Sequence, residues 1–208
     1  ILRDLKRLEE AEISAKKSIE LKSDLANSYQ NLGCILRDLN KIKEAEFCLR
    51  KEIELQPKLP SSHLILATLL AEIGQPEEAK LSVMKAIELQ PDNAKSHLIL
   101  GAILKDLSNL KGAELSMRKA IELDPNDAQA FSNLGVILKD LDRENEGLDC
   151  QLKAIQLSPD LVIAHLNLGG ALRDLGRLEE AELATLKAMK LAPLLPSANA
   201  NLGTIFND

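Results

Sequence analysis

The apolar side chains of this chain recur at the three- and four-residue spacing of one face of an α-helix. Between residues 94 and 123 two such faces follow each other, separated by the polar pair Ser108-Asn109. Asp124-Pro125 ends the second pattern, because proline cannot extend a helix and biases the preceding residue away from helical geometry. The pattern therefore predicts two amphipathic helices joined by a short turn.

This helix pair recurs every 34 residues, with no insertion or deletion. One marker is a leucine followed by a small residue, at Leu32-Gly33, Leu66-Ala67, Leu100-Gly101, Leu134-Gly135, Leu168-Gly169 and Leu202-Gly203. A second marker is the series Pro57, Pro91, Pro125, Pro159 and Pro193. We number the positions of each repeat from 1, starting at Ala26, Pro60, Ala94, Ala128, Val162 and Pro196. Small residues at positions 8 and 20 allow the two helices of a repeat to approach closely.

A single helix pair cannot bury both of its faces, whereas stacked pairs bury a continuous core. The sequence therefore predicts an all-α fold, an α-solenoid of antiparallel helix pairs. We expect one array over residues 1–208, with a partial repeat 1–25, repeats 26–59, 60–93, 94–127, 128–161 and 162–195, and a partial repeat 196–208. The predicted helices span 7–21, 26–39, 42–55, 60–73, 76–89, 94–107, 110–123, 128–141, 144–157, 162–175, 178–191 and 196–208.

The spacing of these markers resembles the tetratricopeptide repeat, in which an aromatic residue precedes the leucine–glycine pair and a proline closes the repeat. One copy reads Tyr29, Leu32-Gly33, Leu36, Ala45, Leu49 and Pro57, and another reads Phe131, Leu134-Gly135, Leu138, Gly147 and Pro159. The aromatic position instead holds His63, His97, His165 and Asn199 in four repeats, and Glu52 replaces a usual alanine. The resemblance implies a right-handed superhelix whose first helices line a concave groove that binds a peptide or an extended segment. Pentatricopeptide arrays have a similar period, but they bind RNA through a basic surface and this chain is acidic.

Position 6 faces the groove by that resemblance, and it holds asparagine in four repeats. These candidates are Asn31, Asn133, Asn167 and Asn201, with Ile65 and Ile99 in between. An amide carries both donors and an acceptor, so such a column could hold a peptide backbone without reading its side chains. The column resembles the asparagine ladder of the O-linked N-acetylglucosamine transferase superhelix. Alternatively, these amides are hydrogen-bonded to water or to a neighbouring turn.

Positions 12 and 13 place a basic residue beside an acidic one in five of six copies. The pairs are Arg3-Asp4, Arg37-Asp38, Lys105-Asp106, Lys139-Asp140 and Arg173-Asp174. One interpretation is a polar rail for a charged peptide, with Lys105, Lys139 and Arg173 as contacts. The other is that the basic residue of one repeat pairs with the aspartate of the next, which would leave the column neutral.

Leucines at position 5, namely Leu64, Leu98 and Leu166, make the middle of the expected groove apolar. An exposed apolar strip usually marks a contact surface. The alternative is that a neighbouring helix covers these side chains.

Composition excludes several classes of partner. The formal net charge is −6, which argues against nucleic acid and against an anionic membrane surface. No apolar run reaches membrane-spanning length. Cys34, Cys48 and Cys150 are an odd number without metal-ligand spacing, which is typical of thiols in a reducing compartment and favours a cytoplasmic location.

The sequence contains no nucleophile motif, phosphate loop or dinucleotide fingerprint, so we expect no catalytic residue, no cofactor and no metal. His63 and His97 stand a whole repeat apart, too far to share a zinc ion. The acidic strings Glu9-Glu10-Ala11-Glu12 and Glu179-Glu180-Ala181-Glu182 are expected on a solvated outer face.

These observations predict a scaffold that binds a protein or peptide in its groove and is not an enzyme. The alternative is the substrate-adaptor arm of a larger enzyme of glycosyltransferase or sulfotransferase type. A third interpretation is end-to-end self-association, since the terminal helices of the chain, with Leu202 and Phe206 in the last one, would lack a covering helix.

Overall fold

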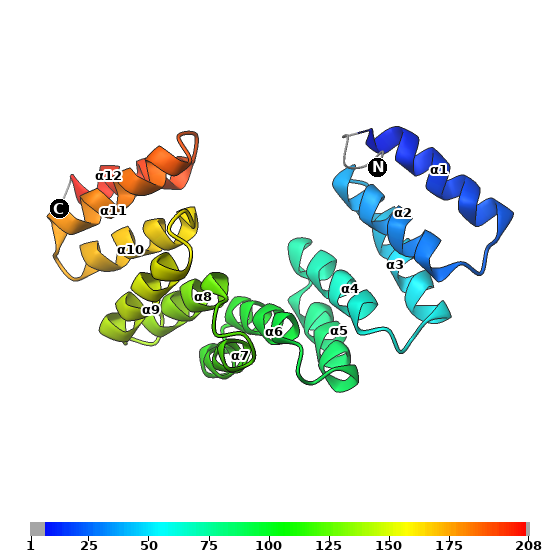
Figure 1. The fold of residues 1–208 in the computed structure, drawn as a ribbon, viewed down its shortest axis with the longest axis horizontal. Coiled ribbons are helices and arrows are strands. Elements are labelled where there is room, and N and C mark those ends of the chain that lie inside the picture. The colour runs from blue at the N-terminus through cyan, green and yellow to red at the C-terminus, as the bar shows by residue number, and fades with distance from the viewer. Residues whose placement is uncertain (1–6, 207–208) are drawn as a thin grey trace. The chain divides into compact units, whose positions relative to one another are not determined.

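The computed structural model describes residues 7–206, which contain helices and no strand (Figure 1). The helices are α1 (Leu8–Leu21), α2 (Ala26–Asp38), α3 (Ile42–Leu55), α4 (Pro60–Glu72), α5 (Pro76–Leu89), α6 (Ala94–Asp106), α7 (Leu110–Leu123), α8 (Ala128–Lys139), α9 (Glu144–Leu157), α10 (Val162–Asp174), α11 (Leu178–Leu191) and α12 (Pro196–Ile205). The predicted all-α fold of antiparallel helix pairs is confirmed. The predicted pair Arg3-Asp4 and the last two residues of the final predicted helix lie outside the described residues.

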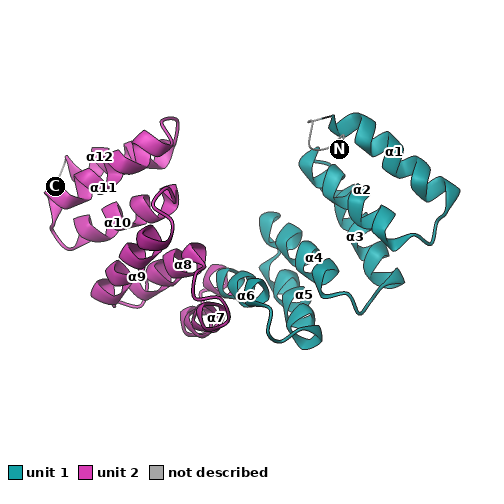
Figure 2. Cartoon of the chain, viewed as in Figure 1, with its two compact units in different colours: residues 1–103 teal, residues 104–208 magenta. Residues whose placement is uncertain are grey.

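The chain divides into two compact units, residues 1–103 and residues 104–208 (Figure 2). In unit 1, α2 packs against α3 and α4 packs against α5, while α1 covers α2 and α3 contacts α4. In unit 2 the same scheme joins α8 to α9 and α10 to α11, and α10 also contacts α8 and α12. Within each unit, α2, α4, α8 and α10 therefore each pack on the second helix of their own repeat.

The small residues at positions 8 and 20 lie where two helices cross most closely. A Cβ atom on Gly135 of α8 would come within 2.8 Å of the carbonyl oxygen of Gly147 on α9. A Cβ atom on Gly147 would lie 2.7 Å from the carbonyl oxygen of Gly135. Since real Cβ atoms do not approach other heavy atoms so closely, the contact requires glycine on both helices.

Several first helices end one or two residues before the predicted boundary, and a repeated turn explains the difference. After α2, Asn40 adopts a φ of 58°, and the N–H of Lys41 donates to the carbonyl of Leu36 over 2.8 Å. This six-to-one hydrogen bond and left-handed residue form a helix-ending motif that satisfies the last carbonyls. The equivalent left-handed residues in the other repeats are Gly74, Ser108, Asp142 and Gly176.

Histidines at the aromatic position tie α4, α6 and α10 to the turn that precedes each of these helices. Nε2 of His63 lies 2.9 Å from the carbonyl oxygen of Pro57, and Nε2 of His165 lies 2.8 Å from that of Pro159. Because a carbonyl oxygen only accepts, each ring donates from Nε2. The histidines therefore act as packing residues that also satisfy a carbonyl in the preceding turn.

We expected from the sequence that the acidic string near the start of the chain would be wholly solvated. In the structure it is not. Glu12 is buried, and it accepts hydrogen bonds from Lys16 of its own helix (2.6 Å) and from Lys41 of the next repeat (2.7 Å). These hydrogen bonds, that from Lys16 first, hold the pKa of Glu12 below its ordinary value. The expectation fails because the next repeat brings Lys41 over this carboxylate.

Unit 2 repeats that arrangement with other residues at the same positions. Glu114 of α7 pairs with Arg118 of the same helix and with Arg143, 29 residues later, both at 2.8 Å. An acid shared between two bases is thus a recurring link between consecutive repeats.

Candidate functional site

A polar hollow of about 230 Å³ lies on the first helices of unit 2. Side chains of α8, α10 and α12 line most of it. It brings together four of the residues that the sequence had marked as groove candidates, Lys139, Asn167, Arg173 and Asn201. This face therefore has the position and chemistry expected of a groove.

The two asparagines of the hollow are anchored through their amide nitrogens. Nδ2 of Asn167 donates to Oγ of Ser132 over 3.2 Å, and Nδ2 of Asn201 donates to the carbonyl oxygen of Leu166 over 3.2 Å. Each of these hydrogen bonds joins an asparagine to a residue of the preceding repeat. Neither Oδ1 atom takes part in a hydrogen bond within residues 7–206, so both amide oxygens keep their acceptor capacity.

The buried side-chain amide of Gln151 supports the asparagine hollow from beneath. Gln151 on α9 donates from Nε2 to the carbonyl oxygen of Ser132 (2.8 Å), and the Ser132 hydroxyl donates to Oε1 of Gln151 (3.0 Å). Gln151 is 2% exposed. The hydrogen bonds run on to Asn167 through the Ser132 hydroxyl, so Gln151 fixes the orientation of an amide that faces the hollow.

Sequence analysis missed Gln151, although a signal was present. Position 24 of the repeat is otherwise held by smaller or apolar residues, Leu49, Val83, Met117 and Thr185. Among the complete repeats, Gln151 is the one long polar side chain at this position.

Gly170 lines the hollow, and the space above its Cα is open. A Cβ atom on its neighbour Gly169 would come too close to the Thr185 hydroxyl on α11, whereas one on Gly170 would meet nothing within 4 Å. Gly169 is therefore required for packing, while Gly170 leaves room beside Asn167 that the other residue types at this position would partly fill.

Charged residues at the edge of the hollow are paired with each other. Nζ of Lys139 lies 2.5 Å from Oδ2 of Asp174, one repeat further on, and Arg173 also pairs with Asp174 (2.6 Å). Burial acts to raise the pKa of Asp174, but the hydrogen bonds from Lys139 and Arg173 outweigh it and lower the pKa below its ordinary value. Arg173 in addition donates to the Thr204 hydroxyl on α12 over 2.9 Å. The pair of Lys139 with Asp174 is the kind of contact between repeats that the pairing interpretation describes.

Leu166 also lines this hollow, whereas the remaining candidates lie outside it. Asn133 accepts a hydrogen bond from Gln129 on its own helix (3.0 Å), and Asn31 is exposed on α2. Leu98 and Lys105 are half-buried on α6. Leu64 is 8% exposed, as is Leu166, so neighbouring elements cover both and the expected exposed strip is absent there.

Within residues 7–206, no three side chains of histidine, cysteine, aspartate or glutamate converge in a way that could hold a metal ion. In the same part of the chain, no helix combines the length and the apolar character that crossing a membrane would require.

Comparisons with known proteins agree with the repeat pattern. Three family models, each described as a tetratricopeptide repeat, match residues 26–59, residues 117–149, and residues 66–128 with 152–196. No curated protein sequence matches the chain.

Solved structures of similar fold include three of different origin. Cut9-Hcn1 of the APC/C hetero-tetramer matches 99% of this chain and 41% of its own, with a TM-score of 0.86 and 18% identity. YrrB, described as a TPR protein with an unusual peptide-binding site, matches 89% of this chain and 96% of its own, with a TM-score of 0.65 and 24% identity. MamA from Desulfovibrio magneticus RS-1 matches 82% of this chain and 97% of its own, with a TM-score of 0.70 and 22% identity. At these identities the likeness concerns the fold.

Proposed function

The chain belongs to the tetratricopeptide repeat family, and from this premise we propose that it is a non-enzymatic binding module that holds an extended polypeptide segment. The proposed site is the hollow on α8, α10 and α12 of unit 2. YrrB, by its printed description, has a peptide-binding site, and Cut9 forms a complex with Hcn1. Both are consistent with a binding role on this fold.

The observation that carries the proposal is the pair of acceptor oxygens on Asn167 and Asn201. Both amides are held by hydrogen bonds through Nδ2, and both leave Oδ1 for a ligand. An extended segment has backbone N–H groups without partners of its own, and a buried N–H must find an acceptor. Two fixed acceptors one repeat apart suit such a segment, whichever side chains it carries.

The charges around the hollow favour recognition of the ligand's backbone over recognition of its charged side chains. Lys139 and Arg173 share the carboxylate of Asp174, so the ligand meets ion pairs that are already formed. A ligand carboxylate would have to compete with Asp174, and exposed ion pairs contribute only about 0–1 kcal/mol. The space beside Gly170 then admits one small or medium side chain of the segment.

A second candidate role is that of a substrate-adaptor arm of a larger enzyme. It follows from the asparagines at position 6 in four repeats, a column that resembles the one in the superhelix of a glycosyltransferase. In that role the same groove would hold substrate proteins for a larger enzyme. The sequence of the complete gene product distinguishes the two roles, since only the second requires a catalytic domain on the same polypeptide.

The test is the affinity of a peptide selected from a displayed library of random 12-residue sequences. We expect Asn167→Ala with Asn201→Ala to weaken binding by about 1–3 kcal/mol, at roughly 0.5–1.5 kcal/mol for each hydrogen bond lost. Asn133→Ala, alone and combined with Asn167→Ala, tests the remaining member of the column in unit 2. Asn199→Ala is the matched control, because Asn199 is an exposed asparagine on the same helix as Asn201 and does not line the hollow.

N-methylation of the peptide, one residue at a time, identifies the N–H groups that matter. A methyl group on the peptide nitrogen that contacts Asn201 should weaken binding to the parent chain. The same methyl group should have little effect on the affinity for the Asn201→Ala variant, which has already lost that contact. If the double variant binds every selected peptide as tightly as the parent does, the proposed site is wrong.

A further inference from the structure

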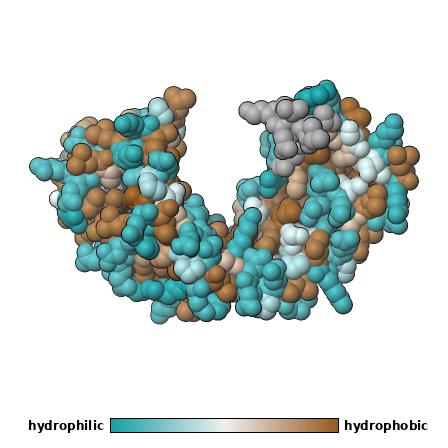
Figure 3. All heavy atoms as spheres, in the orientation of Figure 1, coloured by the Kyte–Doolittle hydropathy of each residue, from teal (hydrophilic) through white to brown (hydrophobic). Residues whose placement is uncertain are grey.

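The outer faces of the second helices carry a series of exposed apolar side chains. Position 22 of the repeat holds a large apolar residue in five of six copies, and each is 60–71% exposed: Ile13, Phe47, Leu81, Leu115 and Leu183. Asp149 is the exception. Figure 3 shows apolar residues on the surface of each unit, interspersed with charged ones. Because large apolar side chains rarely stand exposed in a regular series, this series suggests contact surfaces.

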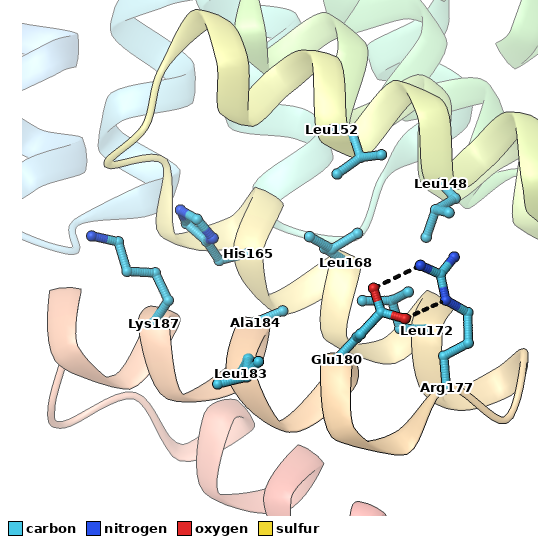
Figure 4. Close-up of a pocket in the computed structure, with 10 residues that line it drawn as sticks. All are labelled: Leu148, Leu152, His165, Leu168, Leu172, Arg177, Glu180, Leu183, Ala184 and Lys187. Atoms are coloured by element: carbon cyan, nitrogen blue, oxygen red, sulfur yellow. Dashed lines mark hydrogen bonds and ion pairs between the residues drawn. The ribbon is translucent and has the colours of Figure 1, made fainter.

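Small residues follow each of these apolar side chains and leave grooves between second helices. Position 23 is serine, cysteine or alanine in every copy, namely Ser14, Cys48, Ser82, Ser116, Cys150 and Ala184. In unit 2 the result is a groove of about 350 Å³ between α9 and α11 (Figure 4). Leu168 and Leu172 of α10 lie at its base, and Leu152 and Leu183 lie on its two sides.

Unit 1 contains the same groove at the same repeat positions. Leu32 and Leu36 of α2 form the base, Phe47 and Cys48 line the α3 side, and the volume is again about 350 Å³. Burial raises the pKa of the Cys48 thiol to about 11, so this group is a neutral part of an apolar wall. Two independent copies indicate that the groove is a product of the repeat pattern.

The polar groups around the α9–α11 groove are engaged, with one exception. Nε2 of His165 contacts the carbonyl oxygen of Pro159, and Arg177 pairs with Glu180 at 2.7 Å. Lys187 lies at the opposite end of the groove from that pair (Figure 4). No carboxylate within residues 7–206 pairs with Lys187.

We propose that the α9–α11 groove binds an amphipathic helix of a partner protein, with aliphatic side chains against Leu168, Leu172 and Leu183 and a carboxylate against Lys187. An extended segment would bury N–H and C=O groups against leucine side chains that offer no hydrogen bond, which is costly. A helix satisfies its own backbone and presents side chains at three- and four-residue spacing. Lys187 is the unpaired charge, so the complementary group is an acid.

The length of the groove sets the size of the occupant. Arg177 is the N-cap residue of α11 and Lys187 follows it by ten residues, which corresponds to about 15 Å along the helix axis. A partner helix of about ten residues spans the same distance, with the acid near the end that meets Lys187.

This site is separate from the asparagine hollow on the same unit. Leu168 and Leu172 project from one side of α10, whereas Leu166, Gly170 and Arg173 project from the roughly opposite side, given 3.6 residues per turn. The proposal therefore does not depend on peptide binding at the asparagines, and each site can be occupied while the other is filled.

The test uses a displayed library of 14-residue helices in which four leucines at helical spacing are fixed and the other positions are randomised. The expected result is selection of sequences with aspartate or glutamate at one end of the leucine face. Fluorescence anisotropy with the best binder then compares variants. We expect Leu183→Glu to weaken binding at least about tenfold, because it removes an apolar contact and adds a charge.

Leu115→Glu is the matched control, since Leu115 occupies the same repeat position at 71% exposure and does not line this groove. It should leave the affinity unchanged. Lys187→Glu should weaken binding by roughly three- to tenfold, and replacing the selected acid by lysine in the peptide should restore it. Circular dichroism verifies that each variant is folded, as expected for exposed positions.

Three outcomes overturn the proposal. The first is that the library yields no peptide whose binding is weakened by Leu183→Glu. Another is equal loss with Leu115→Glu and Leu183→Glu, which would indicate non-specific apolar adhesion. The last is a parent chain that dimerises in sedimentation and becomes monomeric with Leu183→Glu, which would make a second copy the occupant.

Discussion

Gln151 on α9 and Ser132 on α8 exchange two hydrogen bonds across the interface of their helix pair, at 2.8 and 3.0 Å. The same serine accepts from Asn167 of the following repeat over 3.2 Å. A buried amide on α9 thereby orients, through Ser132 of α8, a side chain on α10, on the face where we place the peptide.

Gln151→Ala is expected to destabilise unit 2 by about 2–4 kcal/mol, because it leaves a cavity and removes both hydrogen bonds to Ser132. Gln151→Met, which copies Met117 at the same repeat position, should cost less since it fills the space. Urea unfolding measures both. A double-mutant cycle with Ser132→Ala should give a coupling of about 1 kcal/mol or more, and additive effects would contradict the pairing.

Two glycines on the first helices of unit 2 should respond to alanine in opposite ways. Gly135→Ala forces a Cβ to within 2.8 Å of the Gly147 carbonyl oxygen and into contact with Gln151, so we expect a loss of about 1–3 kcal/mol. Gly170→Ala meets nothing within 4 Å and should stabilise its helix by about 0.5–1 kcal/mol. Thermal unfolding of the two variants measures the contrast, and equal effects would show that helix spacing is not set by these contacts.

Glu52 should make stability depend on pH. Its side chain is fully buried on α3, one carboxyl oxygen accepts from Ser62, and the other has no partner within residues 7–206. Burial raises the pKa of Glu52, although the hydrogen bond from Ser62 and the nearby His63 act to lower it. The folded chain therefore prefers the protonated acid.

The sign follows from that preference. The stabilising share of Glu52 is complete below the ordinary carboxyl pKa of 4.5 and is lost as the pH rises through the raised value. Glu52→Gln, which keeps a neutral polar group, should be more stable than the parent at neutral pH and should show a weaker decline with pH. Urea midpoints across this range give the comparison. Glu72→Gln, an exposed glutamate at the end of α4, serves as control, and identical slopes for parent and Glu52→Gln would refute the assignment.

We predict that residues 1–208 act as one array, since the 34-residue period continues without a break. In a repeat protein each repeat is coupled to its neighbours along the chain, so the array is expected to unfold as one cooperative system. Calorimetry should give equal calorimetric and van't Hoff enthalpies, and the far-ultraviolet spectrum should be strongly helical. Two resolved transitions would instead identify residues 1–103 and 104–208 as separate folding units.

Much of the fold could be predicted from the sequence because its determinants are local. Apolar spacing, together with proline at 57 and its equivalents, defines the helix pairs within a few residues. The repeated leucine and small-residue positions then indicate which faces pack. The first helices α2, α4, α6, α8 and α10 ended one or two residues early, where a turn with a left-handed residue closes each of them.

The candidate sites were harder to predict. The asparagines of the hollow were found from their shared repeat position, but Gln151 was not, since its role depends on the serine that faces it. The grooves between second helices escaped notice because small residues at position 23 are unremarkable in sequence, and a groove exists only when two second helices lie side by side.

By itself, the sequence determined the helices, their pairing and the 34-residue repeat, since these depend on residues close together in the chain. Only the tertiary structure decided that Glu12 is buried under Lys41, that Lys139 pairs with Asp174, and that Asn201 is held by the carbonyl of Leu166. These contacts join residues 29–35 positions apart. Which side chains a neighbouring repeat covers, and which it leaves to a partner, is set by the distance and angle between helices that no local pattern encodes.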